Sequence, residues 1–381
     1  MMVRTASIAL LITALVIQPA CWNRLYPQQV VNLSDSSQTL LSRWQHARHE
    51  ASARSFSGGY WIGYLIKKVM DENSFVGSYS SDPGKNKPTL REVITGIKQE
   101  HVEPLSGRDF EGEMEGEFSF ENGGSYKKQI LKEIGILVHI RTSPAPDIDE
   151  VKISNLSLHV SLNDDPLIWI GSAPGDESVD FLQSVYAQVP SADVRKKIII
   201  AVGIHHPTEK VFQFLRSILL GSDIGDLRKE ATFWIGRCNT DDAVILLEQR
   251  IHTDPAAEVR EQSVFVLGEM ENKKAVESLI RMARDEGDET VRKNAVFWLG
   301  QKVSVKLSTA DHGRERQDEN TEIKKKAVFA LSRFTDNRGL EALINVARGN
   351  DDLPVRREAV FWLSQLDNKL ALDALIDILR N

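Results

Sequence analysis

Cysteine is scarce in this 381-residue chain, and neither sign of charge predominates. The two cysteines, Cys21 and Cys238, exclude a disulfide framework and any zinc site built on CxxC motifs. Lys and Arg together number 47 and Asp and Glu 54, which gives a net charge of −7. This balance lacks the basic excess of nucleic-acid-binding proteins, so we expect no nucleic-acid partner. A complete catalytic constellation is also missing, and we expect neither a cofactor nor a metal.

The chain also lacks a recognisable membrane span, for which about 20 apolar residues are needed. The shorter apolar run from Ala6 to Ile17 follows Arg4, as in a secretory signal. We therefore expect residues 1–20 to be a signal peptide and the protein to be exported, to the periplasm or cell envelope or as a secreted protein. Ala20 followed by Cys21 resembles a bacterial lipoprotein junction, where a lipid on Cys21 would give the only membrane contact. Gln18 stands where that motif prefers an aliphatic residue, and it is also poor for ordinary signal cleavage, so lipidation and plain secretion both stay open. A buried or interfacial N-terminal helix is the alternative to export.

The length predicts roughly two domains. Residues 21–54 form a polar helical or linker segment, and residues 55–172 a small β-rich domain. In the second region, runs rich in Val, Ile and Tyr are separated by Gly, Pro, Asp and Asn, and they occupy residues 59–69, 132–141, 151–162 and 165–171. The acidic, glycine-rich stretch 108–124 favours a solvated hairpin over a cation site, because its residues do not follow the alternating pattern of oxygen ligands found in cation-binding loops.

Beyond residue 173 the sequence becomes helical and repeats itself. VRKNAVFWLGQ begins at Val291, and VRREAVFWLSQ begins at Val355, 64 residues later (355 − 291). Blocks of this kind start 32 residues apart, at Leu227, Val259, Val291, Ile323 and Val355, and a further copy starts at Val194. A constant period near 30 predicts a solenoid of stacked helix pairs, each too small to bury its own apolar face. The expected fold class is therefore α+β multidomain, with a small β-rich N-terminal domain followed by an α-solenoid of about six helix pairs over residues 173–381.

Each block has an internal pattern. Its first, fifth, eighth and ninth residues lie on one stripe of a helix, and the phenylalanine in the seventh place lies off that stripe. We therefore expect a helix covered on several sides, with Phe297 and Trp298 both largely buried. Tryptophan fills the eighth place in every second block, and this alternation of large and smaller residues would let successive layers interdigitate. A second amphipathic helix follows, as in residues 275–283, 339–347 and 371–379.

Block strings that begin with VR or IK and end with LG or LS resemble HEAT repeats, most of all the short bacterial kind named after phycobilisome lyases. The resemblance covers residues 191–381. It implies first helices on the convex side, second helices on the concave side, and a protein partner. The whole chain also resembles exported bacterial proteins that have a β-rich part before such repeats.

Some members of that family are enzymes, and this sequence departs from each kind. Its repeats contain no His-Glu pair of the sort that holds the iron of the hydroxylases. Residues 191–381 carry 30 Lys and Arg against 31 Asp and Glu, which does not suit the basic groove of the DNA-repair enzymes. Export would keep the chain from the cytoplasmic targets of bilin lyases. We predict a non-enzymatic protein–protein interaction or scaffold module of the cell envelope; the alternative is an enzyme with its active site in residues 55–172 and a solenoid that recruits substrate.

A few single residues have a structural and a functional interpretation. His46 and His49 are spaced for one metal ion, but without a third ligand a solvated helix face is favoured. His205 and His206 end a helix, where they favour capping, and Cys238 falls on a core stripe as a small hydrophobe. The basic residue in the second place of each block favours a bond to an acidic group between units over a phosphate ladder; these residues are Arg195, Arg228, Arg260, Arg292, Lys324 and Arg356.

The fourth block breaks the pattern. Its second helix should occupy about residues 306–316, but Ala310 is the only apolar residue from Ser308 to Glu322. We expect an exposed loop or a loosely held helix there, either through drift at a tolerant surface or as a gap that meets a partner. The candidate partner residues in this gap are His312, Arg314, Glu315 and Arg316. The other candidates lie on the second helices of neighbouring units: Glu277, Arg281, Arg284, Glu341, Asn345 and Arg348.

Overall fold

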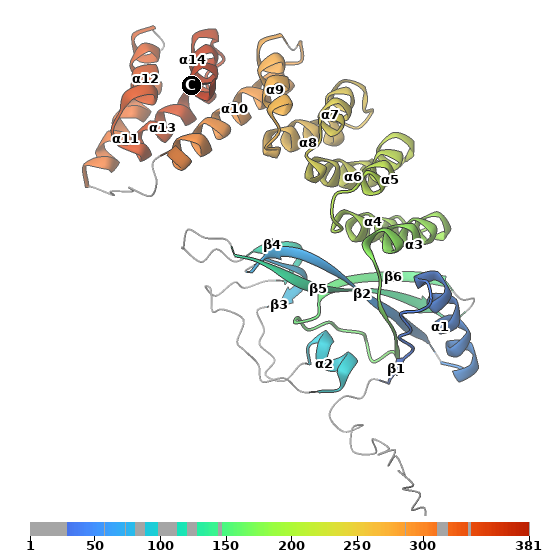
Figure 1. The fold of residues 1–381 in the computed structure, drawn as a ribbon. Helices are drawn as coiled ribbons and strands as arrows, with labels where there is room; N and C mark the ends of the chain where they lie inside the picture. The colour runs from blue at the N-terminus through green and yellow to red at the C-terminus, as the bar shows by residue number, and fades with distance from the viewer. Residues whose placement is uncertain are drawn as a thin grey trace, which may run out of the picture. The chain divides into compact units, whose positions relative to one another are not determined.

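The computed structural model describes residues 29–56, 58–72, 74–80, 88–97, 113–119, 128–143, 147–285, 287–310, 319–333 and 337–380. The chain forms two compact units, Met1–Pro174 and Gly175–Asn381 (Figure 1). Within the described residues, no helix combines the length and the apolar character that a membrane crossing requires. The predicted signal peptide and Cys21 lie outside these residues.

A five-stranded mixed sheet forms the centre of the N-terminal unit. Its spatial order is β1-β7-β2-β5-β6, in which β7 is parallel to β1 and β2, while β5 is antiparallel to β2 and β6. The strands are β1 (Val30–Asn32), β2 (Gly59–Asp71), β5 (Gln129–Arg141), β6 (Asp147–Asn155) and β7 (Leu167–Ser172). All four predicted β runs contain a strand, although the run 151–162 leaves the sheet after Asn155.

Two helices pack on this sheet. Helix α1 (Leu40–Arg54) contacts β7 and β2, and its side chains Leu40, Trp44 and Ala47 are buried. Because β1 and α1 both come from residues 21–54, that segment is part of the sheet unit. Helix α2 (Leu90–Thr95) begins with a capping box at Thr89 and packs in the core around Trp61.

The acidic stretch 108–124 does not form a hairpin with itself in its described part. Its residues Glu113–Ser119 form β4, which pairs antiparallel with β3 (Ser74–Ser80) in a separate two-stranded sheet. The hairpin prediction is therefore wrong in its pairing, because a strand from much earlier in the chain supplies the partner. The backbone N–H of Val76 in β3 donates to the side chain of Asn155, 2.6 Å away, and ties β3 to the end of β6.

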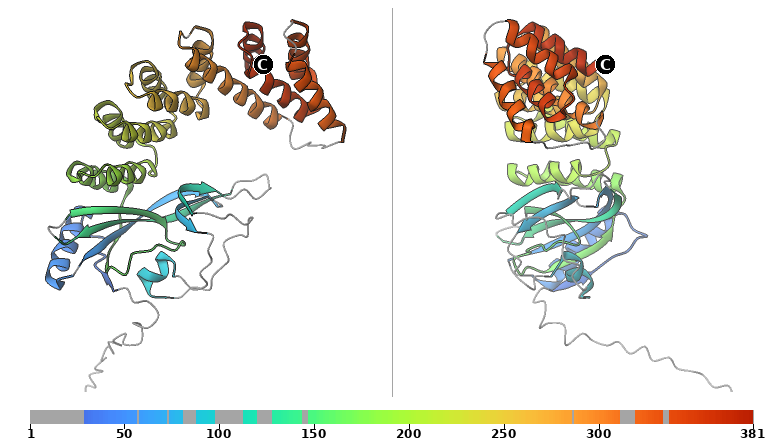
Figure 2. Two further views of the ribbon diagram at one scale, coloured as in Figure 1. Left: turned by 180° about the vertical axis from the view of Figure 1, so that it is seen from behind. Right: turned by 90° about the vertical axis from the view of Figure 1, so that its left-hand side faces the viewer.

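Every regular element in the described part of the C-terminal unit is a helix. The first helices of the six blocks are α4 (Ala192–Gly203), α6 (Gly225–Cys238), α8 (Ala257–Glu269), α10 (Glu289–Ala310), α11 (Glu319–Ser332) and α13 (Leu353–Ser364). The second helices are α5 (Glu209–Gly221), α7 (Asp241–Thr253), α9 (Lys273–Asp285), α12 (Asn337–Gly349) and α14 (Lys369–Arg380), and α3 (Gly175–Gln188) precedes them all. The predicted solenoid is confirmed (Figure 2).

Successive first helices interlock through the eighth and tenth places of their blocks. The indole of Trp298 lies where a Cβ of Gly268 would be, and Trp234 stands in the same relation to Gly203. Val266 fills the corresponding space above Gly236. Because the glycine has no side chain, it leaves space for the eighth-place residue of the next block. The alternation in the sequence therefore corresponds to packing between layers.

Phe297 and Trp298 are partly buried, less completely than the residues in the first, fifth and ninth places of their block. The phenylalanines in the seventh place face the outer side of the first helices, and four of them are 37–45% exposed. Each of these rings leans on a tryptophan; Phe265 meets Trp298 edge to face at 5.1 Å between ring centroids. The apolar seventh place is thus covered by an aromatic neighbour instead of a further helix.

The fourth block departs from the pattern in a way that the sequence did not indicate. Residues 301–310 continue the first helix, so that α10 runs unbroken from Glu289 to Ala310, and no separate second helix starts near residue 306. Helix α10 packs against α8 and α9 on one side and against α13 and α14 on the other. Helix α13 in turn packs on α11 and α12, so the α13–α14 pair lies between α10 and the α11–α12 pair (Figures 1 and 2). The last two units are therefore stacked in reverse of their sequence order.

Specific contacts stabilise this reversal. Gly300 of α10 and Ser364 of α13, both in the tenth place, approach so closely that a Cβ on the glycine would overlap the serine. Val303 and Leu307 of the extension are 0% and 6% exposed. Lys306 donates to the carbonyls of Ile378 and Leu379, at 3.3 and 2.8 Å, and thereby caps the C-terminal end of α14.

Candidate interaction surface

Ion pairs join four second helices into one charged surface. Arg281 of α9 pairs with Glu248 of α7, and Arg284 of α9 pairs with Asp373 of α14 at 2.9 Å. One turn further along α14, Asp377 pairs with Arg348 of α12, also at 2.9 Å. The order α7, α9, α14, α12 follows from these contacts. We call this row of three pairs the ion-pair ladder.

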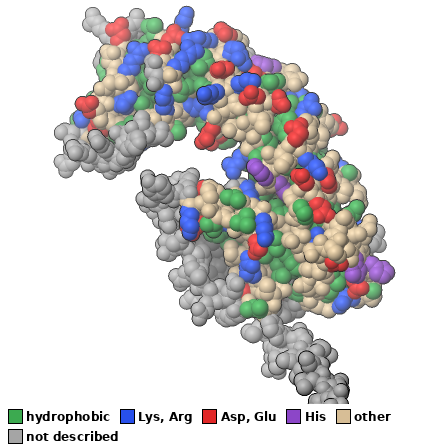
Figure 3. All heavy atoms as spheres, in the orientation of Figure 1, with side chains coloured by type: hydrophobic (Ala, Val, Ile, Leu, Met, Phe, Trp, Pro, Cys, Tyr) green, Lys and Arg blue, Asp and Glu red, His purple; other side chains and the backbone are tan. Residues whose placement is uncertain are grey.

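The side chains of the ladder face solvent. The three arginines are 58%, 43% and 49% exposed, in the order Arg281, Arg284, Arg348. Basic and acidic side chains are intermingled over the solenoid in Figure 3. A surface of this kind suits a partner that itself carries both signs of charge, rather than a polyanion.

The structure brings together part of the predicted partner surface. All six residues predicted on the second helices are exposed, and three of them are the arginines of the ladder. Glu277 lies on α9, and Glu341 and Asn345 lie on α12. His312, Arg314, Glu315 and Arg316 lie outside the described residues. The carboxylates Glu248, Asp373 and Asp377 were missed, and only Glu248 could have been paired from sequence order.

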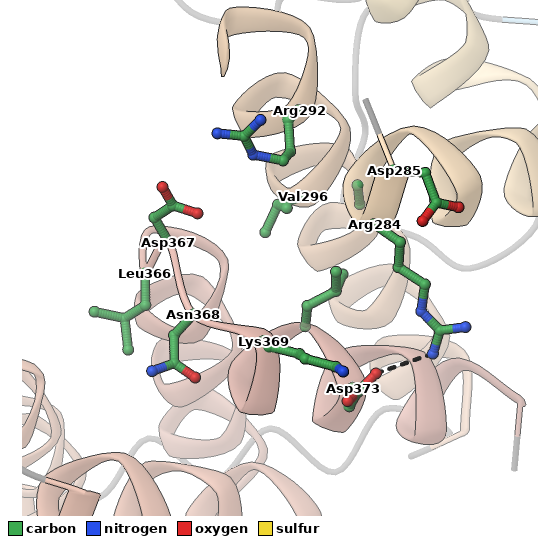
Figure 4. Close-up of a pocket in the computed structure, with 11 residues that line it drawn as sticks. Arg284, Asp285, Arg292, Val296, Leu366, Asp367, Asn368, Lys369 and Asp373 are labelled. Atoms are coloured by element: carbon green, nitrogen blue, oxygen red, sulfur yellow. Dashed lines mark hydrogen bonds and ion pairs between the residues drawn. The ribbon is translucent and has the colours of Figure 1, made fainter. Parts of the chain in front are cut away.

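A pocket of about 650 Å³ opens beside the ladder, between α9, α10, α14 and the connection that joins α13 to α14 (Figure 4). Arg284 and Asp373 form one side of it, with their ion pair drawn as a dashed line. Arg292 of α10 and Lys369 at the start of α14 also line it, together with Asp285 and Asp367. The lining therefore holds three basic and three acidic side chains and favours no single charge.

The basic residues in the second place of the blocks bond acidic groups between units, as the sequence favoured, in at least two blocks. Arg228 forms a two-pronged contact with Asp254, at 3.0 Å from Nε and 2.9 Å from Nη2. Burial raises the pKa of Asp254, but hydrogen bonds from Arg228 and Arg250 outweigh it and leave that pKa below its ordinary value. Lys324 makes the corresponding contact with Asp352 at 3.4 Å.

The isolated histidines of the sequence have structural surroundings. His46 and His49 lie on the exposed face of α1, which fits the solvated interpretation. Nδ1 of the buried His205 lies 2.7 Å from the carbonyl oxygen of Ala201 and caps the last turn of α4. Within the described ranges, His, Cys, Asp and Glu side chains nowhere gather in threes that could hold a metal ion.

Cys238 is less deeply placed than the sequence suggested. The side chain is only partly buried, and its Sγ lies 3.7 Å from the carbonyl oxygen of Trp234. Burial and the nearby Glu209 raise the pKa of the thiol to about 11. The side chain is therefore an unreactive thiol near neutral pH.

His139 lies between two carboxylates in an arrangement that the sequence analysis missed. Its Nδ1 lies 2.6 Å from Asp149 of β6, and its Nε2 lies 3.1 Å from Asp165, just before β7. Gly59 leaves the space for the ring, because a Cβ there would overlap it. Both ring nitrogens face carboxylates, so neither is presented to a substrate as a general base, and the cluster ties β5, β6 and the approach to β7 together.

The stacked helix pairs define the C-terminal unit as an α-solenoid. The family model of HEAT repeats matches residues 212–300 and 314–381, and this part of the chain is made of HEAT repeats. The stretch between the two matches contains the extension of α10. HEAT repeats commonly mediate protein–protein interactions.

A solved structure of human deoxyhypusine hydroxylase in complex with glycerol is similar at 10% identity and a TM-score of 0.28, over 54% of this chain and 97% of that chain. Likeness at this level carries no argument about activity. A search of curated protein sequences finds no match to the chain.

Proposed function

We propose that the protein is a non-enzymatic interaction scaffold that binds a protein partner through the second-helix face of its solenoid. The observation that carries this proposal is the ion-pair ladder, a row of half-exposed charges across four helices. An exposed pair contributes only about 0–1 kcal/mol to stability. Folding therefore has little need of the ladder, whereas a partner gains orientation and faster association from such a row.

Site-specific photo-crosslinking tests this proposal. A photo-reactive residue is placed at Glu277 or Asn345 on the second helices, and matched controls are placed at Lys229 and Glu261 on first helices; all four side chains are exposed. We expect the same protein to be captured from Glu277 and Asn345 but not from the controls. Capture from the first helices alone would refute the assignment of the surface.

The compartment is a separate part of the proposal. Residues 1–20 act as a signal peptide, and the scaffold works in the cell envelope, either secreted or anchored by a lipid on Cys21. The support is the apolar run Ala6 to Ile17 and the Ala20–Cys21 junction.

A reporter that is active only outside the cytoplasm, fused after residue 30, should be active. Cys21→Ser should release the fusion from membranes if the cysteine is lipidated, and an unchanged distribution would indicate plain secretion. An inactive reporter would contradict export altogether.

A further inference from the structure

Helix α11 exposes a stripe of residues that is buried in the other blocks. Ile323, in the first place of its block, is 65% exposed. The residues in the same place of the other five blocks are 0–8% exposed: Val194, Leu227, Val259, Val291 and Val355. Ala327, in the fifth place, is exposed, whereas its counterparts are 0% exposed, and Leu331, in the ninth, is half-buried where its counterparts are 0% exposed.

The reversed order of the last two units explains this exposure. In the regular part of the stack, the helices of the preceding unit cover the stripe, as α9 and α8 do for α10. The same cover is provided for α13 by α12 and α11. Helix α10 precedes α11 in the sequence, but it packs against α13 and α14 instead. Within the described part of the chain, the stripe of Ile323, Ala327, Ala330 and Leu331 is therefore the open end of the stack.

We propose that a second copy of this chain covers the stripe, with α11 packed antiparallel against α11 of that copy across a twofold axis. The element that covers this stripe elsewhere in the molecule is always another repeat helix of the same chain. The contact of Gly300 with Ser364 shows that two first helices of this chain can also meet through like places when the residues there are small. Ala327 and Ala330 provide such small residues at the centre of the stripe.

Charge along α11 fits the antiparallel arrangement. Glu322, near the start of the helix, pairs with Lys325 at 3.0 Å but has a side chain that is 70% exposed, and Arg333, just after the end of the helix, is exposed as well. A twofold axis near Ala327 sets Ile323 against Leu331 of the other copy and brings Glu322 beside the other Arg333. Lys326 lies on the same flank in both copies, so the two ammonium groups repel each other and weaken the pair.

The contact is small, because one helix from each copy supplies it. Stable protein interfaces bury about 1,200–2,000 Å² in total, so this one belongs with the weak associations. Sedimentation at protein concentrations of about 1–500 μM should detect the association, since a weak dimer dissociates in that range. The full chain is used with Cys21→Ser, so that a lipid cannot simulate association.

We expect a concentration-dependent dimer that Ala327→Arg abolishes and Lys326→Ala strengthens. Ala257→Arg, at an exposed alanine of α8, is the matched control and should leave the dimer intact. Ala327→Cys should form an intermolecular disulfide at least about tenfold faster than Ala257→Cys, because effective concentration is high across the axis.

Two results would overturn the proposal. The first is a chain that stays monomeric at the highest concentration, and the second is a dimer that survives Ala327→Arg. Crosslinking of Ala327→Cys to a foreign protein, with no dimer, would assign the stripe to that protein and equally contradict self-association.

Discussion

The basic side chain in the second place of a block meets different surroundings in different units. Arg228 and Asp254 have side chains that are 7% and 0% exposed, whereas Lys324 is 48% exposed beside Asp352 at 12%. The role in the repeat is the same, since each side chain links its unit to the acidic residue that precedes the next block. Burial decides how much each link contributes, because solvent screens only the exposed charge.

Alanine at these two positions should therefore have unequal effects. Arg228→Ala leaves a buried carboxylate with Arg250 and the backbone N–H of Ala256 as its remaining partners, and we expect a loss of about 3–5 kcal/mol in the free energy of unfolding. Lys324→Ala should cost about 0–1 kcal/mol. Urea denaturation measures both, and equal losses would mean that burial does not separate the two sites.

The Arg228–Asp254 link also has a predicted pH dependence. Because the pKa of Asp254 is lowered in the folded state, its stabilisation is present above the unfolded pKa of about 4 and is lost as the pH falls through the folded value. The difference in unfolding free energy between the wild type and Asp254→Asn should thus be full near pH 7 and shrink below about pH 4. A difference that stayed constant across this range would contradict the assignment.

At the scale of the helix, the tenth-place glycines are packing sites. They accept the large eighth-place residue of the next block, and none of Gly203, Gly236 and Gly268 has a positive φ. Their requirement is space rather than backbone freedom. A helical glycine without such a neighbour is Gly221 at the end of α5, where a Cβ would meet nothing within 4 Å.

Adding one methyl group should separate these two situations. Gly268→Ala would push against the indole of Trp298, and overpacking of this kind costs about 1–3 kcal/mol. Gly221→Ala should be neutral or stabilising by up to about 1 kcal/mol, since alanine has the higher helix propensity. Thermal unfolding of the two variants is the measurement, and a stabilised Gly268→Ala would refute the interlocking of the blocks.

A smaller side chain in place of the Trp298 indole provides the control for this effect. Trp298→Val places at that site the residue type that faces Gly236 from position 266. If the two side chains compete for one space, Gly268→Ala should cost less in the Trp298→Val background than alone. Strictly additive effects would show that the glycine matters for another reason.

Much of this fold could be predicted from local patterns in the sequence. The period of the blocks and the stripe of first, fifth and ninth residues predicted the helices and most of their buried faces. The same pattern did not indicate the partial exposure of the seventh-place phenylalanines, because an aromatic ring on the outer side can be covered by a neighbouring tryptophan without a further helix. The pairing of β4 with β3 was also beyond prediction, since strand propensity does not specify a distant partner.

For the whole molecule, the order in which the units stack decides which helices meet, whereas the number of units does not. A constant spacing of blocks says nothing about which face of one unit meets the next. Val303 and Leu307 belong to an extension of the first helix that packs on α14, whereas the block pattern predicted that a second helix would begin near residue 306. The ion-pair ladder depends on this order too, because α14 places Asp373 and Asp377 between Arg284 and Arg348.

Hydrogen exchange can read this order directly. Leu375 of α14 is 0% exposed, and Leu375→Ala should destabilise its surroundings by about 2–5 kcal/mol. Repeat units couple mainly to their neighbours in space, so the damage should reach residues 303–307 of α10 as well as α12 and α13. A stack in sequence order would leave α10 protected, because the α11–α12 unit would separate it from α14.

Leu247→Ala in α7, also at a site that is 0% exposed, is the matched control and should raise exchange in α6, α8 and α9 but not in α14. Unchanged protection of residues 303–307 in the Leu375→Ala variant would refute the reversed stacking, and with it the open stripe of α11.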